Sequence, residues 1–110
     1  MLSQKHRLSK FAEVKKTTAK GRSFFNPFFV IKFLPEDHPP RITVVTSVKV
    51  SKKAVDRNRV KRIIREGIRK YIEQIKPGNY AVLVKAAAVK ISGKELREQV
   101  EKSLKIAKII

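Results

Sequence analysis

Apolar positions in the middle of the chain recur with the spacing of an α-helix. Between residues 56 and 75 they fall three or four apart, at Val60, Ile63, Ile64, Ile68, Tyr71, Ile72 and Ile75. This spacing places them on one face of a helix. Asp56 stands where a carboxylate would cap the N-terminus of that helix, and Lys76-Pro77-Gly78 ends the pattern. The pattern predicts a helix over 56–75 with one buried stripe.

Two further segments are typical of helices. Residues 7–20 are polar with intermittent apolar positions and end at Gly21, a plausible C-cap. Ser92 is followed three residues later by Glu95, which is the pattern of a capping box. The helix that it predicts carries one apolar face, formed by Leu96, Val100, Leu104, Ala107 and Ile109.

Three apolar runs predict strands. Residues 28–34 are aromatic and β-branched, residues 42–50 are rich in Val, Ile and Thr, and residues 80–87 are short and apolar. Residues 36–40 form a turn between the first two runs. The order is a helix, two or three strands, a helix, a strand and a helix. We therefore expect one α+β domain over residues 1–110, built as layers of helix and sheet.

The charge changes the picture most. Lys and Arg number 27 against 9 Asp and Glu, so the formal net charge is +18. A compact domain with this charge repels itself, which is tolerated when the partner is a polyanion. We expect that polyanion to be a nucleic acid. The longest apolar run, 28–34, is too short to span a membrane, and no cysteine is present for disulfides or a zinc ribbon. We expect a cytoplasmic protein.

The basic side chains of the central helix form a row. At about 100° per residue, Asn58, Arg62, Arg65 and Arg69 fall within about 60° of one another, roughly opposite the apolar stripe. Arg57, Lys61 and Arg59 lie at the borders of that stripe, and Lys49, Lys52 and Lys53 extend the positive region upstream. Guanidinium groups bind phosphate oxygens through two parallel hydrogen bonds. The row is predicted to bind RNA or DNA phosphates.

The aromatic run separates into two faces of one strand. Phe29, Ile31 and Phe33 share a face that we assign to the core, while Phe28, Val30 and Lys32 share the other. Exposed aromatic rings over a basic surface hold unpaired bases by stacking. Phe28 and Phe11 are the candidates for such contacts, and core packing is the competing interpretation for both.

No group of residues predicts catalysis by the protein itself. His6 and His38 stand alone in polar stretches, and the acids are scattered without a close pair for general acid–base or two-metal chemistry. The chain also lacks a glycine-rich loop that would hold phosphates. We therefore expect neither catalytic residues nor a protein metal site.

The segment Arg57-Asn58-Arg59, continued by Val60-Lys61-Arg62-Ile63-Ile64-Arg65-Glu66, resembles the Arg-Asn-Arg motif of the bacterial ribonuclease P protein subunit. The resemblance extends over nearly the whole chain, from Arg7-Leu8 through Gly21 and the aromatic strand to the last helix. Two positions that are usually aromatic in that family read Val14 and Thr18 here. Ser51 stands near the position of the family's usual glycine, before the motif.

The resemblance implies a fold and a function. The fold is a two-layer α–β sandwich of about four strands and three helices with a left-handed βαβ crossover, as in the second domain of a small-subunit ribosomal protein. The protein is then a monomeric subunit of a ribonucleoprotein whose RNA is the catalyst. It assists removal of the 5′ leader of precursor tRNA, and magnesium belongs to the RNA–protein complex.

The resemblance also assigns residues. The motif side chains Arg57, Asn58, Arg59, Lys61, Arg62 and Arg65 are expected on the catalytic RNA. A cleft between the first helix and the sheet is expected to hold the leader, lined by Phe11, Val14, Lys15, Phe28, Val30 and Lys32. The alternatives are a ribosomal or other structural RNA-binding protein, a stand-alone nuclease, and a DNA-binding or membrane-surface protein.

Overall fold

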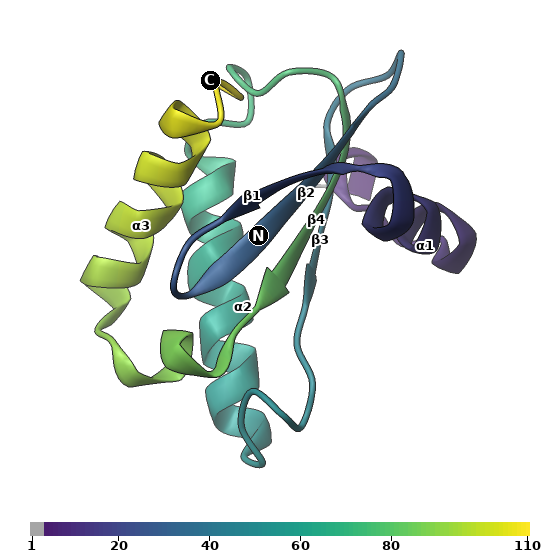
Figure 1. Ribbon diagram of the computed structural model, residues 1–110. Helices are drawn as coiled ribbons and strands as arrows, with labels where there is room; N and C mark the ends of the chain where they lie inside the picture. The colour runs from purple at the N-terminus through teal and green to yellow at the C-terminus, as the bar shows by residue number, and fades with distance from the viewer. Residues whose placement is uncertain (1–3) are drawn as a thin grey trace.

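The computed structural model describes residues 4–110, which form one four-stranded sheet with three α-helices (Figure 1). The strands are β1 (Arg22–Phe25), β2 (Phe29–Pro35), β3 (Arg41–Val45) and β4 (Gly78–Val84), in the order β1-β2-β4-β3. The helices are α1 (Phe11–Lys20), α2 (Ala54–Arg69) and α3 (Gly93–Ile106), and short 3₁₀ turns occupy η1 (Gln4–His6) and η2 (Ala86–Lys90). The sheet is mixed, because β4 pairs antiparallel with β2 and parallel with β3.

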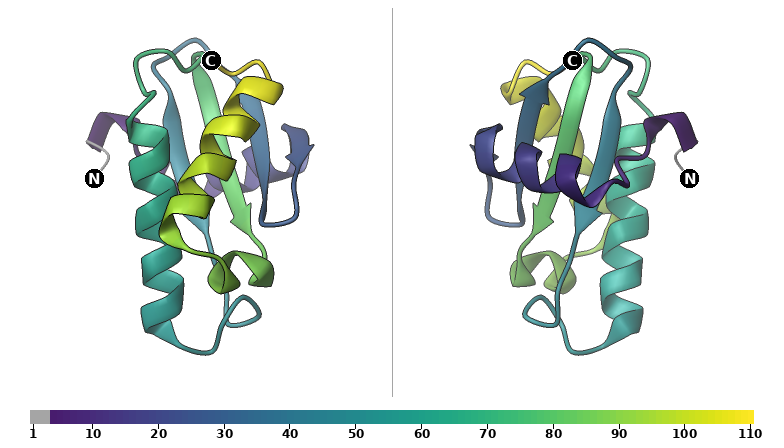
Figure 2. Two further views of the ribbon diagram at one scale, coloured as in Figure 1. Left: turned by 90° about the vertical axis from the view of Figure 1, so that its left-hand side faces the viewer. Right: turned by 90° about the vertical axis from the view of Figure 1, so that its right-hand side faces the viewer.

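The crossover from β3 through α2 to β4 is left-handed. In the left view of Figure 2, α2 lies in front of the sheet, both strands run downwards, and the chain moves from β3 on the left to β4 on the right. Nearly all βαβ crossovers have the opposite hand. The α+β fold and the crossover expected from the resemblance are thus confirmed.

Helices α2 and α3 cover one face of the sheet, and the core lies beneath them (Figure 1). The stripe predicted on α2 is buried at Val60, Ile63, Ile64 and Ile68. From α3, Leu96, Val100 and Leu104 fill the space beside it. The strands contribute alternate residues, including Phe29 and Ile31 of β2, which confirms the core face predicted for that strand.

Helix α1 lies against the opposite face of the sheet (Figure 2). The predicted helix began at Arg7, but the helix starts at Phe11. The preceding residues join the sheet instead, since Arg7 forms a parallel bridge with Ile42 and the Leu8 amide donates to the Ile42 carbonyl at 3.0 Å. Gly21 does follow the helix. A Cβ there would lie 2.5 Å from the Thr17 carbonyl oxygen, so the close approach excludes other residues.

Several predicted boundaries were wrong. The second strand ends at Val45 rather than Val50, and residues 46–53 form a connector with a turn. Asp56 is not the cap of α2: Lys53 holds the N-cap position, and Asp56 in the first turn accepts a hydrogen bond from Ser51. Helix α2 ends at Arg69, and a series of turns continues to Ile75.

The remaining boundaries differ less. The last strand spans Gly78–Val84 rather than 80–87, and β1, a separate strand before the aromatic run, was not assigned from the sequence. Ser92 caps α3 as predicted, and its hydroxyl accepts the Glu95 amide at 3.1 Å. Among residues 4–110, no helix is long and apolar enough to cross a membrane.

Candidate nucleic-acid interface

The outward side of α2 presents the predicted basic row. Asn58, Arg62 and Arg69 are exposed and Arg65 is half-buried, while the opposite side of the same helix supplies the core. A single helix therefore fixes the spacing of the row, because its buried stripe fixes its rotation against the sheet. The structure brings these four predicted residues together.

Within residues 4–110, no acidic side chain forms an ion pair with this row. The ion pairs among residues 4–110 are Lys16–Glu36, Arg41–Glu13, Arg97–Glu66 and Lys105–Glu101, and none involves a basic residue of α2. Glu66, which belongs to α2, pairs with α3 instead. The other acid of the helix, Asp56, accepts a hydrogen bond from the Ser51 hydroxyl at 3.1 Å. The positive charge on the outward side is therefore available to an anionic partner.

Two motif arginines have structural contacts. Nη1 of Arg57 donates to the Ser51 carbonyl at 2.7 Å, and Nη2 of Arg59 donates to the Ile91 carbonyl at 3.3 Å. Each bond uses one of five guanidinium donors, so both residues hold neighbouring segments in place and keep donors for a ligand. These partners lie far apart in sequence or in an irregular loop, so the sequence pattern does not reveal them.

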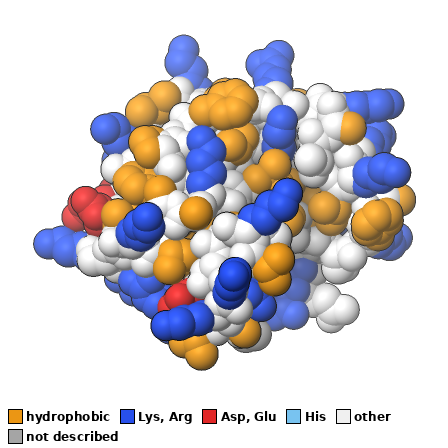
Figure 3. Space-filling model, turned by 60° about the horizontal axis from the view of Figure 1, so that its bottom comes forward, with side chains coloured by type: hydrophobic (Ala, Val, Ile, Leu, Met, Phe, Trp, Pro, Cys, Tyr) orange, Lys and Arg blue, Asp and Glu red, His pale blue; other side chains and the backbone are white. Residues whose placement is uncertain are grey.

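The connector before α2 carries the predicted lysines. Lys49, Lys52 and Lys53 are exposed. Ser51 orders the end of this segment, because its hydroxyl also accepts the Lys53 amide at 3.2 Å. Figure 3 shows the end of the molecule to which the connector belongs, where blue basic side chains are spread between orange hydrophobic ones and few acids appear. The connector and the row on α2 form one basic surface.

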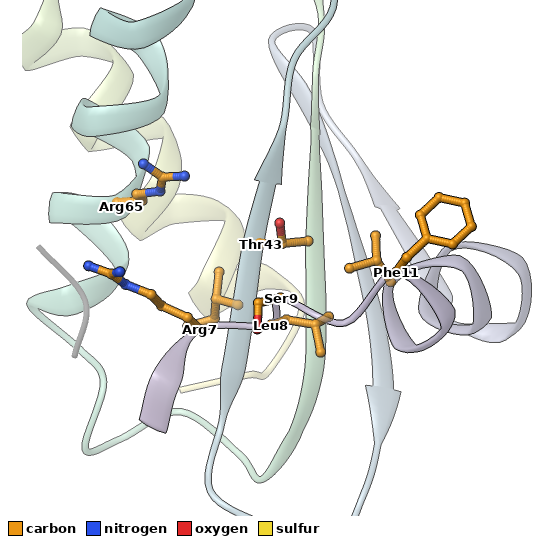
Figure 4. A pocket seen from close by; sticks show the side chains of 8 residues that line it. Arg7, Leu8, Ser9, Phe11, Thr43 and Arg65 are labelled. Atoms are coloured by element: carbon orange, nitrogen blue, oxygen red, sulfur yellow. The ribbon is translucent and has the colours of Figure 1, made fainter. Parts of the chain in front are cut away.

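A hollow of about 440 Å³ lies between the start of α1, β3 and α2 (Figure 4). The figure shows Arg7 and Arg65 on one side of β3 and Phe11 on the other. The ring of Phe11 is 81% exposed, which leaves it available for stacking. The hollow is lined by Arg7, Leu8, Ser9, Phe11, Val14, Ile42, Thr43 and Arg65. It combines apolar walls with cationic groups.

This hollow unites only part of the predicted cleft. Phe11 and Val14 line it, and Lys15 is an exposed residue of α1. Val30 is buried in β2, and the Lys32 ammonium donates to the Ser23 hydroxyl at 2.5 Å. Phe28 is half-buried and packs against the core.

Arg7 and Thr43 line the hollow without having been assigned to it from the sequence. Their positions depend on the pairing of the N-terminal segment with β3, which no local pattern predicts. The hollow also includes Arg65, which was assigned to the basic row, so one side chain belongs to both features.

A magnesium ion does not fit the side chains of this surface. Magnesium binds oxygen ligands, carboxylates above all, whereas the outward row of α2 offers guanidinium and ammonium groups. Within the described range 4–110, no cluster of three or more His, Cys, Asp or Glu side chains is arranged to hold a metal.

Comparison with known proteins identifies relatives by sequence. The sequence model of the Ribonuclease P family matches residues 2–108. The ribonuclease P protein component of Xylella fastidiosa is 36% identical over 77 residues, which cover 70% of this chain and 57% of that protein. That of Xanthomonas oryzae is 31% identical over 78 residues, covering 71% of this chain and 54% of that protein. The chain thus spans about half the length of the curated relatives it matches.

Solved structures give the same result. The ribonuclease P protein of Staphylococcus aureus superimposes with a TM-score of 0.88 at 28% identity, covering 94% of this chain and 96% of that one. The protein from Thermotoga maritima, solved in complex with 1-(4-fluorophenyl)-2-thiourea, gives a TM-score of 0.81 at 26% identity, covering 90% and 97%. Since the family's sequence model and these folds both match over nearly all of residues 4–110, the chain belongs to the ribonuclease P protein family.

Proposed function

We propose that this protein is the protein subunit of the ribonuclease P ribonucleoprotein and assists endonucleolytic removal of the 5′ leader from precursor tRNA. The RNA subunit is the catalyst, and the protein alone is inactive. The observation that carries the proposal is the row on α2, whose arginines lack ion-pair partners among residues 4–110, beside a hollow that shares Arg65.

The basic row and the lysine connector bind the ribonuclease P RNA. Arg62, Arg65 and Arg69 donate to phosphate oxygens, and each contact releases counterions from the RNA, so affinity falls steeply with salt. Arg57 and Arg59 contribute their remaining donors. Because the guanidinium groups project from one rigid helix, the backbone that carries them is ordered before the RNA binds, and only the side chains lose freedom on binding.

The hollow beside α1 holds the unpaired leader. The exposed ring of Phe11 provides a stacking surface, and Arg7 and Arg65 lie at the same hollow to meet phosphates. Arg65 belongs to both the row and the hollow, which supports a leader bound directly beside the catalytic RNA. This arrangement accounts for a protein that raises substrate affinity without taking part in the chemistry.

Magnesium in this proposal is bound by RNA phosphates in the complex. The protein's contribution is to neutralise phosphates around it, which lowers the magnesium concentration that the folded RNA needs. The protein acts as a monomer in the cytoplasm.

A competition experiment tests the proposal against a general role in RNA structure. Labelled ribonuclease P RNA is bound to the protein, and unlabelled ribosomal RNA of equal length is added at several salt concentrations. We expect the ribosomal RNA to displace the labelled RNA only at a large excess. Equal competition by both RNAs at every salt concentration would contradict the proposal and favour a structural RNA-binding protein.

A further inference from the structure

Four apolar residues form a row across the sheet, one from each strand. The register pairs Phe25 with Val30, Val30 with Leu83, and Leu83 with Val45. With neighbouring strands about 4.8 Å apart, such a row runs straight across the sheet from β1 to β3.

This apolar row, which is distinct from the basic row on α2, lies on the face of the sheet that α1 partly covers. Phe29 and Ile31 point into the core under α2 and α3, so Val30 between them points the other way. Ser23 shares that side, because its hydroxyl accepts the Lys32 ammonium, and Phe25 follows by alternation. The apolar row therefore lies on the same side of the sheet as the leader contacts proposed for α1.

The row ends in an exposed aromatic ring. Phe25 is 74% exposed at the edge strand β1, whereas Val30 is 8% exposed. The Lys85 ammonium lies 6.0 Å from the centre of the Phe25 ring. A hydrogen bond of 2.9 Å to the Asn26 carbonyl holds it there.

Lys85 retains donors for a ligand. An ammonium group has three donors, and the Asn26 carbonyl takes one. Lys85 forms no ion pair with any residue in the range 4–110. Asn26 in turn caps the turn between β1 and β2, since its side-chain oxygen accepts the amides of Phe28 and Phe29 at 2.7 and 2.8 Å.

We propose that Phe25 and Lys85 form a nucleotide-binding site for the precursor tRNA leader, in which an unpaired base stacks on the Phe25 ring and its phosphate binds the Lys85 ammonium. This inference rests on the function proposed above. Phe25 thereby supplies an aromatic contact that Phe28 does not, because Phe28 packs against the core.

Charge selects a nucleic acid over a protein as the occupant. An exposed ring with an ammonium group 6.0 Å from its centre offers a stacking surface for a base and a cation for its phosphate. A second copy of this chain, with net charge +18, would bring like charges together at the same place. The side of the sheet selects the leader, since the row continues across the face against which α1 lies.

The test measures substrate affinity of the complete protein–RNA complex. Precursor tRNAs with a graded series of leader lengths are bound by complexes containing wild type, Phe25→Ala or Phe25→Tyr. We expect Phe25→Ala to weaken binding of the longer leaders about 5- to 150-fold, because stacking contributes about 1–3 kcal/mol per base. Binding of the shortest leaders and of mature tRNA should not change, and Phe25→Tyr should bind as wild type.

A fluorescent base reports the contact directly. We expect 2-aminopurine at one leader position to be quenched by wild type and by Phe25→Tyr, and not by Phe25→Ala. Lys85→Ala should reduce the salt slope of leader binding by about one. The matched control is Lys94→Ala, an exposed lysine on α3, which should behave as wild type.

Three results would overturn the inference. The first is that the wild-type complex binds precursor tRNA more tightly when the leader is longer, but Phe25→Ala leaves this affinity unchanged. The second is a Phe25-dependent dimer of the protein without RNA, which would assign the ring to self-association. The third is a wild-type complex that binds ribonuclease P RNA but gains nothing from any leader, which would refute the proposed leader-holding role as well. Because Phe25 is 74% exposed, its variants should unfold at the same urea concentration as the wild-type protein.

Discussion

Glu66 on α2 forms its ion pair with Arg97 on α3, with 3.9 Å between Oε2 and Nη2. The pair turns an acid of α2 toward the neighbouring helix and away from the outward row. The arginines of that row consequently repel one another and attract polyanions. The charge of the interface is thus decided by helix packing as well as by composition.

Replacing Arg62 and Arg65 by alanine should weaken binding of ribonuclease P RNA. Each lost phosphate contact is expected to reduce the slope of log affinity against log salt by about one. Filter binding at several salt concentrations measures the slope. The control is the double variant Lys94→Ala and Lys102→Ala, which removes two exposed cations from α3 that form no ion pair within residues 4–110. A slope that falls equally in the control would contradict the assignment of the row.

Ser51 should order the lysine connector. Its hydroxyl donates to Asp56 and accepts the Lys53 amide, so Ser51→Ala should destabilise the fold by about 1 kcal/mol and weaken RNA binding. The matched variant is Ser47→Ala, whose hydroxyl accepts only the Lys49 amide in an exposed turn. Urea unfolding and RNA titration compare the two. Equal effects of both variants would show that Ser51 has no special role.

The parts of the fold that could be predicted are those set by local patterns. The apolar stripe that includes Val60 and Ile64 decides which face of α2 is buried, whatever element the helix packs against. Ser92 caps α3 by accepting a hydrogen bond from the amide of Glu95, three residues later. The start of α1 could not be predicted, because Leu8 is held by Ile42, which is distant in sequence. Strand β1 is four residues long and shows no alternation, so its pairing with β2 alone defines it.

The candidate site divides in the same way. Helical spacing alone places Arg62 and Arg69 on one outward face. The hollow depends on β3 meeting the N-terminal segment, so Arg7 and Thr43 were not assigned to it. Exposure of Phe25 and burial of Phe29 follow from strand register and from which face the helices cover, and a run of aromatic residues does not carry that information.

Gly78 should be indispensable to the start of β4. Its φ is +144°, a conformation that side chains rarely adopt, and a Cβ would lie 2.6 Å from the Leu34 carbonyl oxygen. Gly78→Ala should therefore destabilise the protein by more than about 1 kcal/mol. At Gly93 a Cβ would meet the ends of two side chains, Ile63 at 3.3 Å and Arg97 at 3.7 Å, so Gly93→Ala should have little effect. Urea unfolding of both variants measures the contrast, and equal stabilities would contradict it.

The Tyr71–Glu101 hydrogen bond should make the stability of the fold depend on pH in the acidic range. The bond from the Tyr71 hydroxyl lowers the pKa of Glu101 below its ordinary value. The hydrogen bond therefore contributes fully to the stability of the fold above the pKa of Glu101 in the unfolded chain, about 4.3. This contribution is lost as pH falls through the lower pKa of Glu101 in the folded protein. Tyr71→Phe should show a smaller loss of stability between about pH 5 and about pH 3, measured by urea unfolding. Identical losses in the two proteins would contradict this role.

Reconstitution of the cleavage reaction tests the central claim most directly. The protein is mixed with a bacterial ribonuclease P RNA at low magnesium, and cleavage of a precursor tRNA with a 5′ leader is followed beside protein-only and RNA-only controls. The account predicts that only the mixture cleaves efficiently, at the mature 5′ end. Cleavage by the protein alone, or a mixture no more active than the RNA alone, would contradict it.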